Sequence, residues 1–126
     1  MKSTAKKFTA QIADHTSYDQ SEPGFAGFVA LEYNRSPDLV FLGVYGQILV
    51  PNPGVEVQLV YAHPQGTNPG ILLLNVLLLQ WEGVWPEVQT WKSAYYLGVG
   101  TAPGAITDIQ LNAPFGSETV KVIQLN

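Results

Sequence analysis

Residues 71–79 read ILLLNVLLL, and no other stretch of the chain is so apolar. In a β-strand, alternate side chains point to opposite faces. One face of such a strand would hold Leu72, Leu74, Val76 and Leu78, and the other would hold Ile71, Leu73, Asn75, Leu77 and Leu79. Both faces would be apolar, so the run predicts a strand that is covered on both sides.

The same run could instead form a helix, because Asn68 followed by Pro69 resembles an N-cap and a first-turn proline. That helix would be apolar all round and only about three turns long. It would also interrupt a chain whose remaining pattern indicates strands. We therefore expect a strand and keep the helix as the alternative.

Proline and glycine punctuate the whole chain, with nine prolines and twelve glycines gathered in turn-like clusters. Between these clusters we expect strands at residues 7–13, 24–34, 39–50, 55–63, 71–79, 87–97, 105–112 and 119–125. Gly27, Gly43 and Gly46 lie inside predicted strands, where glycine usually marks a bulge or bend.

This pattern predicts one all-β domain over residues 1–126, with residues 1–6 as a short basic lead-in. We expect a small antiparallel β-sandwich of about seven or eight strands. A closed or partly open β-barrel is the alternative, since strand order cannot be derived from the pattern.

Self-association is the simplest explanation for the apolar surplus. Charged residues make up 13% of the chain, about half the usual share of roughly 25%. A single small sandwich also covers only one face of a strand that is apolar on both. We therefore expect a homo-oligomer, with an interface at Leu72, Leu74, Asn75, Leu77 and Leu79. Asn75 would pair with its symmetry mate or bond to a neighbouring backbone group.

The charge pattern disfavours nucleic acid and anionic membranes as partners. The net charge is −4, and three of the six basic residues are Lys2, Lys6 and Lys7. The rest of the chain therefore lacks the cations that would neutralise phosphates. The start carries no apolar segment typical of a secretory signal, and no run is long enough to span a membrane as a helix, so a cytoplasmic location is expected.

No motif in the chain indicates catalysis. There is no cysteine, no G-x-S-x-G, and no glycine-rich phosphate loop with its following helix. His15 and His63 are the only histidines, and nothing places them with other metal ligands. We expect no catalytic residue, no metal and no cofactor, and we lean toward a protein that is not an enzyme.

Aromatic residues gather near position 90, where Trp and Tyr side chains could form a binding surface. The candidate binding residues are Trp85, Trp91 and Tyr95, with His63 beside a loop, and Trp85 is expected to be the most exposed. The main hypothesis is a non-enzymatic domain that acts through self-association and binds an unidentified protein or small molecule. The alternatives are a β-barrel that binds or transforms a small apolar ligand, and a carbohydrate-binding module.

Overall fold

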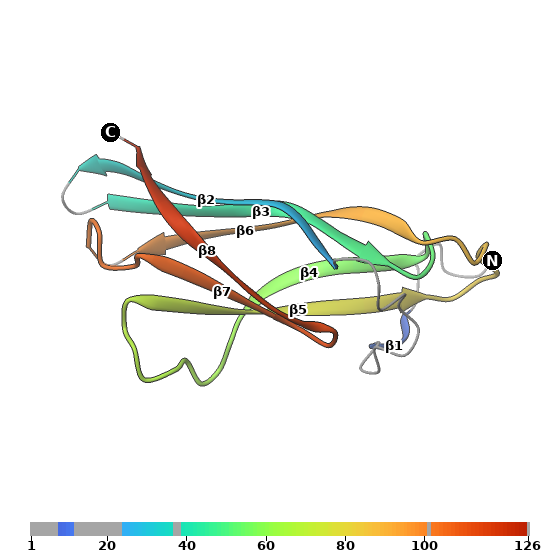
Figure 1. Cartoon of the computed structure of the whole chain (residues 1–126). Coiled ribbons are helices and arrows are strands. Elements are labelled where there is room, and N and C mark those ends of the chain that lie inside the picture. The colour runs from blue at the N-terminus through green and yellow to red at the C-terminus, as the bar shows by residue number, and fades with distance from the viewer. Residues whose placement is uncertain (1–7, 12–23, 37–38, 101, 126) are drawn as a thin grey trace, which may run out of the picture.

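The structure is a computed structural model that describes residues 8–11, 24–36, 39–100 and 102–125. Its elements are β1 (Phe8–Gln11), β2 (Phe25–Ser36), β3 (Leu39–Val50), β4 (Val55–Tyr61), β5 (Ile71–Trp81), β6 (Thr90–Gly100), β7 (Asp108–Ala113) and β8 (Gly116–Leu125) (Figure 1). The all-β prediction is confirmed. The helical alternative for residues 71–79 is wrong, because β5 covers the whole run. The described part of the chain contains no helix that could span a membrane.

Two layers are joined by β8. Sheet A consists of β4, β5, β7 and the first half of β8, with β1 paired to the end of β5. Sheet B consists of the second half of β8 followed by β2, β3 and β6. Lys121 of β8 still pairs with Asp108 in β7, whereas the next residue, Val122, pairs with Ala30 in β2. Figure 1 shows β8 crossing from one layer to the other.

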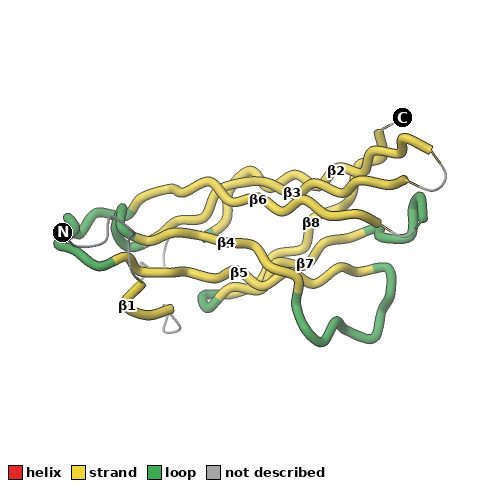
Figure 2. Tube along the Cα trace, turned by 180° about the vertical axis from the view of Figure 1, so that it is seen from behind, coloured by secondary structure: helices red, strands yellow, loops and turns green. Residues whose placement is uncertain are grey.

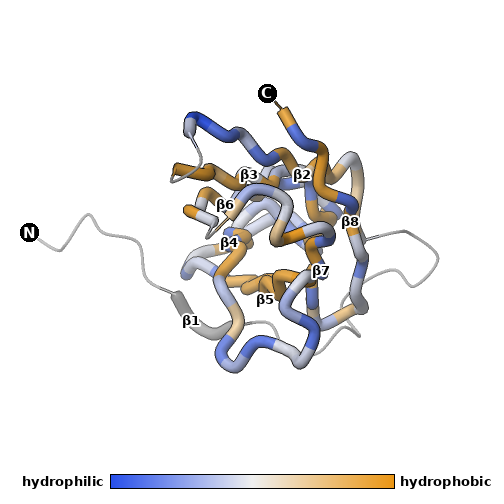
Figure 3. The backbone as a smooth tube through the Cα atoms, turned by 90° about the vertical axis from the view of Figure 1, so that its left-hand side faces the viewer, coloured by the Kyte–Doolittle hydropathy of each residue, from blue (hydrophilic) through white to orange (hydrophobic). Residues whose placement is uncertain are grey.

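The strands therefore form one sheet that is nearly closed into a barrel (Figure 3). Strands β4 and β6 run beside each other where the ring would close, but neither pairs with the other. At one end of this seam, Lys92 Nζ donates a hydrogen bond to the Pro53 carbonyl at 2.7 Å. The sandwich and the partly open barrel are thus two descriptions of one arrangement.

Most strand pairs are antiparallel, as expected, but β2–β8 and β5–β7 are parallel. Parallel neighbours need a crossover connection rather than a hairpin. Strand β6, in the opposite layer, supplies the crossover between β5 and β7.

Among β2 to β8, β3 alone has both predicted bounds, and the ends of the others differ from the prediction by up to three residues. Strand β3 has the predicted bounds, whereas β6 begins at Thr90 instead of residue 87. Pro86 lacks an amide hydrogen for a ladder, and its carbonyl accepts a hydrogen bond from the Val88 amide in a local turn. Strand β1 lies within the predicted 7–13 segment, whose residues 7, 12 and 13 fall outside the described part, as do residues 1–6.

Strand β5 divides its side chains between two environments. One face is fully buried in the core and consists of Leu72, Leu74, Val76 and Leu78. The other face is half-buried and consists of Ile71, Leu73, Asn75, Leu77 and Leu79. The loop after β4 lies against this strand: a Cβ at Gly66 would lie 3.4 Å from Leu73 Cδ1, and the Gln65 side chain accepts a hydrogen bond from the Leu73 amide and donates one to the Leu73 carbonyl. Gln65 thereby continues the ladder of β4 beyond its last residue.

The difference between the two faces of β5 predicts unequal costs for truncation. Leu74→Ala should lower the free energy of unfolding by about 2–5 kcal/mol, because it leaves a cavity in a packed core. Leu77→Ala should cost clearly less, because that side chain is only half-buried. Urea denaturation of both variants measures the difference. Equal losses would show that the outer face of β5 is covered as fully as the core.

Candidate functional site: the outer face of sheet B

Sheet B carries apolar side chains on the side that faces away from the core, and cross-strand pairing aligns them in rows. The rows are Val29, Tyr45 and Tyr95; Ile123, Leu31, Gly43 and Leu97; and Leu125, Tyr33, Phe41 and Val99. Neighbours across paired strands are in side-chain contact range, so the rows form a continuous surface.

Much of this surface is open to solvent. Nine large side chains are between 41% and 75% exposed: Tyr33, Leu39, Phe41, Tyr45, Tyr95, Leu97, Val99, Ile123 and Leu125. We call these nine residues the outer face of sheet B. At roughly 200 Å² for an aromatic side chain and somewhat less for an aliphatic one, their exposed parts amount to about 800 Å². The largest apolar patch on a typical monomer is about 300–600 Å².

Two charged residues of these strands, Glu32 and Lys92, point away from this surface. Glu32, in β2, is only 2% exposed and accepts a hydrogen bond from the Gly104 amide at 2.8 Å. Lys92, in β6, turns toward the Pro53 carbonyl. The rows themselves contain no charged residue, and Arg35 and Lys121 lie just beyond their ends. Sheet B therefore directs carboxylate and ammonium groups away from its outer face and leaves apolar groups on it.

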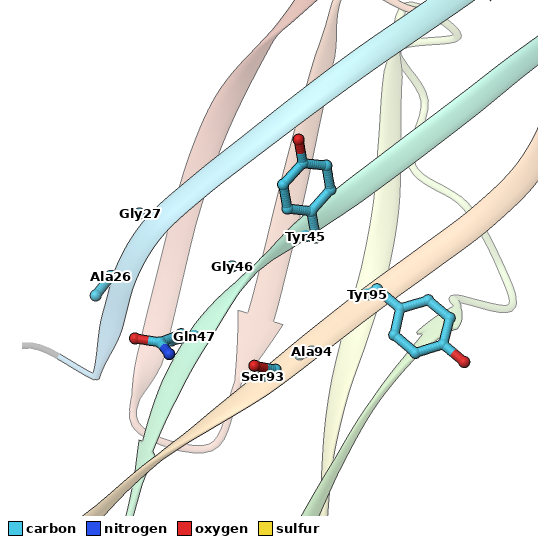
Figure 4. Close-up of a pocket in the computed structure, with 8 residues that line it drawn as sticks. All are labelled: Ala26, Gly27, Tyr45, Gly46, Gln47, Ser93, Ala94 and Tyr95. Carbon is cyan, nitrogen blue, oxygen red and sulfur yellow. The ribbon is translucent and has the colours of Figure 1, made fainter.

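A hollow of about 510 Å³ opens at one side of this surface (Figure 4). It is lined by residues of β2, β3 and β6, with Tyr45 and Tyr95 on one side and Gln47 and Ser93 on the other. The hollow exists because β2 contains a bulge: Gly27 and Phe28 lie between the paired residues Ala26 and Val29.

The predicted bulge at Gly27 is thus confirmed, and its φ of 63° is in the left-handed region. The other two glycines behave differently, since Gly43 pairs regularly with Leu31 in β2 and with Leu97 in β6. Gly46 serves packing, because the Phe28 ring occupies the space that a side chain at Gly46 would need.

The four predicted binding residues are not brought together. Trp91 and Tyr95 lie on the outer side of β6 and are exposed. Trp85 was expected to be the most exposed tryptophan, and that expectation is wrong. Its ring is half-buried against Gly54, and its Nε1 donates to the Trp81 carbonyl at 3.0 Å. His63 belongs to the loop between β4 and β5, and Trp85 belongs to the loop between β5 and β6. Figure 2 shows these two loops at opposite ends of β5.

The residues predicted for an oligomer interface also separate. Leu72 and Leu74 belong to the chain's own core. Asn75, Leu77 and Leu79 lie on the outer face of sheet A, and an interface there stays a prediction. Their cross-strand partners are polar in part: Leu77 pairs with Gln58, and Leu79 pairs with Glu56.

Sequence reasoning missed most of the outer face of sheet B, including Phe41, Tyr45, Leu97 and Val99. A signal was present, because residues 39–46 read LVFLGVYG and are apolar at odd and even positions alike. That is the same doubly apolar pattern that drew attention to residues 71–79. In β3, however, the second apolar face is exposed instead of half-buried.

Titratable groups form no recognisable reaction centre in the described residues. No three His, Asp or Glu side chains there are grouped as a metal ion would require. His15 lies outside the described part of the chain. Comparison with protein-family models found no match, and comparisons with curated proteins and with solved structures found none at the required significance. The site is therefore interpreted from its own residues.

The bulge that forms the hollow can be tested by a pair of glycine substitutions. Gly27→Ala should lower the free energy of unfolding by about 1–2 kcal/mol, because an L-residue is strained at positive φ. Crowding is not the cause, since a Cβ at Gly27 would meet nothing within 4 Å. Gly43→Ala is the control and should be neutral or stabilising, because alanine has a smaller entropy cost in an extended strand. Thermal unfolding of both variants distinguishes these outcomes, and equal effects would contradict the strain argument.

Proposed function

We propose that this protein is a non-enzymatic β-domain that works by self-association through the outer face of sheet B. The observation that carries the proposal is the continuous, uncharged apolar surface of about 800 Å² on paired strands. A surface of this kind is costly to leave in water and typical of an interaction site.

The size of the surface supports a second copy as the occupant. A stable interface of standard size buries about 800 Å² on each partner, which equals the exposed apolar area of this face. A twofold dimer brings the same patch of both subunits together, so the patch must be complementary to itself in shape and charge. A charged patch would repel its copy, and this face carries no charge in its rows.

The geometry of a sheet also suits this pairing. Two sheets pack face to face about 10 Å apart with their strands within about 30° of each other. Two copies of sheet B would thus form an additional sandwich layer between the subunits. The hollow beside Tyr45 and Tyr95, with Gln47 and Ser93 at its edge, provides the polar rim that interfaces usually have.

This proposal moves the expected interface from β5 to sheet B. The outer side of β5 is half-buried already, and its neighbours include Glu56, Gln58 and Gln110. The side chains on the outer face of sheet B are more exposed than those on the outer side of β5, and the rows of sheet B contain no charged residue. The outer face of sheet B is therefore the better candidate for contact with another subunit.

A single charge tests the proposal. Leu97 is 75% exposed, so Leu97→Lys removes little from the core. The wild-type chain should elute at twice its mass of 13.7 kDa in size exclusion with light scattering at micromolar concentration. Leu97→Lys should shift it to the mass of one chain, because an unpaired ammonium in an apolar interface is costly.

Thr119→Lys is the matched control, because Thr119 is exposed on β8 in sheet A. This variant should keep the mass of the wild type. A wild-type protein that is monomeric across the concentration series would overturn the proposal. An oligomer that survives Leu97→Lys would show that another surface forms it.

A further inference from the structure

A cavity of about 150 Å³ reaches into the interior at the end of the sandwich where β4 stops. Its floor consists of Leu42 and Leu72, which are buried in the core, and of Ile106, which packs against the core. Tyr61, the last residue of β4, stands at its mouth and is 44% exposed. The cavity is thus apolar inside and polar where it meets solvent.

Two glycines of β6 lie at this cavity, and the space beside them is taken by the Tyr96 ring at Gly98 and by the Val40 side chain at Gly100. Gly98 pairs with Leu42 and Gly100 pairs with Val40, so both occupy positions that face the interior. A Cβ at Gly98 would lie only 2.7 Å from the hydroxyl oxygen of Tyr96. The Tyr96 side chain therefore extends along its own strand and places its hydroxyl over Gly98, beside the cavity.

The hydroxyl groups of Tyr61 and Tyr96 are the polar features of the cavity. Burial raises the pKa of Tyr96, and the nearby Tyr61 raises it further. The Tyr96 hydroxyl therefore keeps its proton at neutral pH and can donate a hydrogen bond. Both tyrosines line the cavity. The His63 ring packs against Tyr61 with centroids 4.8 Å apart and supports it at the mouth.

We infer that this cavity binds a small aromatic molecule of one ring that carries a hydroxyl group, as in a simple phenol. The ring would lie against Leu42, Leu72 and Ile106, and its hydroxyl would bond to Tyr96 or Tyr61.

Size and shape favour a single ring. A space of about 150 Å³ matches a benzene-sized molecule, so two fused rings with substituents would extend out through its mouth. Tyrosine rings at the side of the cavity favour edge-to-face or offset contact with another aromatic ring.

This inference does not depend on the proposed self-association. Most of the cavity lining points to the interior from β3, β4, β5 and β6, and of the nine residues of the outer face only Val99, which lies between Gly98 and Gly100, also contributes to it. Leu97→Lys, which is designed to separate the subunits, should therefore retain ligand binding. Loss of the oligomer and loss of the ligand can be observed separately.

The test is a titration of the full chain with p-cresol and, in parallel, with toluene, followed by amide chemical shifts. Saturable shifts should appear at Gly98, Gly100 and Ile106. The hydroxyl of p-cresol should make it bind about 5- to 10-fold more tightly than toluene, the value of one hydrogen bond in an apolar site. In the Tyr61→Phe, Tyr96→Phe double variant this preference should disappear, while toluene binding persists.

Two further variants complete the design. Ile106→Phe should fill the cavity and abolish binding of both ligands. Thr119→Val is the control, because it removes a hydroxyl from an exposed residue of β8 that does not line the cavity, and it should change neither affinity. The inference is overturned if no saturable shifts occur in the wild type, or if the double variant keeps the full preference for p-cresol. The comparison of the wild type with the tyrosine double variant does not need Ile106→Phe, so the inference can be tested even if that variant does not fold.

Discussion

The hydrogen-bonded passage of β8 from one layer to the other holds this fold together. Its first half continues sheet A beside β7, and its second half continues sheet B beside β2. Without that passage, the two layers would be joined only by loops and by packing. With it, the strands form a single ladder from β4 round to β6, and the inward side chains of both layers share one core. The seam between β4 and β6 is where this ladder stops.

The sequence supported the fold class and most strand positions, because glycine, proline and alternation act locally. The bounds of β3 and the bulge at Gly27 follow from such local signals. The passage of β8 does not, since nothing in its ten residues marks the step from Lys121 to Val122 where the pairing changes sheets. Two parallel pairs were missed for the same reason: they depend on which distant strands meet, and local pattern carries no information about that.

The candidate site illustrates a related limit. An apolar pattern does not tell whether a strand face is covered within the chain or exposed on its surface. Residues 71–79 and 39–46 are similarly apolar, yet the loop around Gln65 helps to cover the first strand while the second leaves Phe41 and Tyr45 exposed. The interior position of Glu32 also depends on the assembled sheet, because its neighbours Leu31 and Tyr33 are large and apolar and yet lie on the outer side of β2. Orientation is set by pairing across strands, which only the assembled sheet defines.

The seam also has a consequence for how this barrel could change over evolution. In a closed barrel, the number and stagger of hydrogen-bonded strands fix the circumference. Here β4 and β6 are not paired by backbone hydrogen bonds, and Lys92 of β6 instead donates a hydrogen bond to the Pro53 carbonyl before β4. The spacing between β4 and β6 is therefore free of the roughly 4.8 Å that a ladder imposes. Substitutions along these two strands could widen or narrow the interior one side chain at a time, without breaking a single backbone pairing.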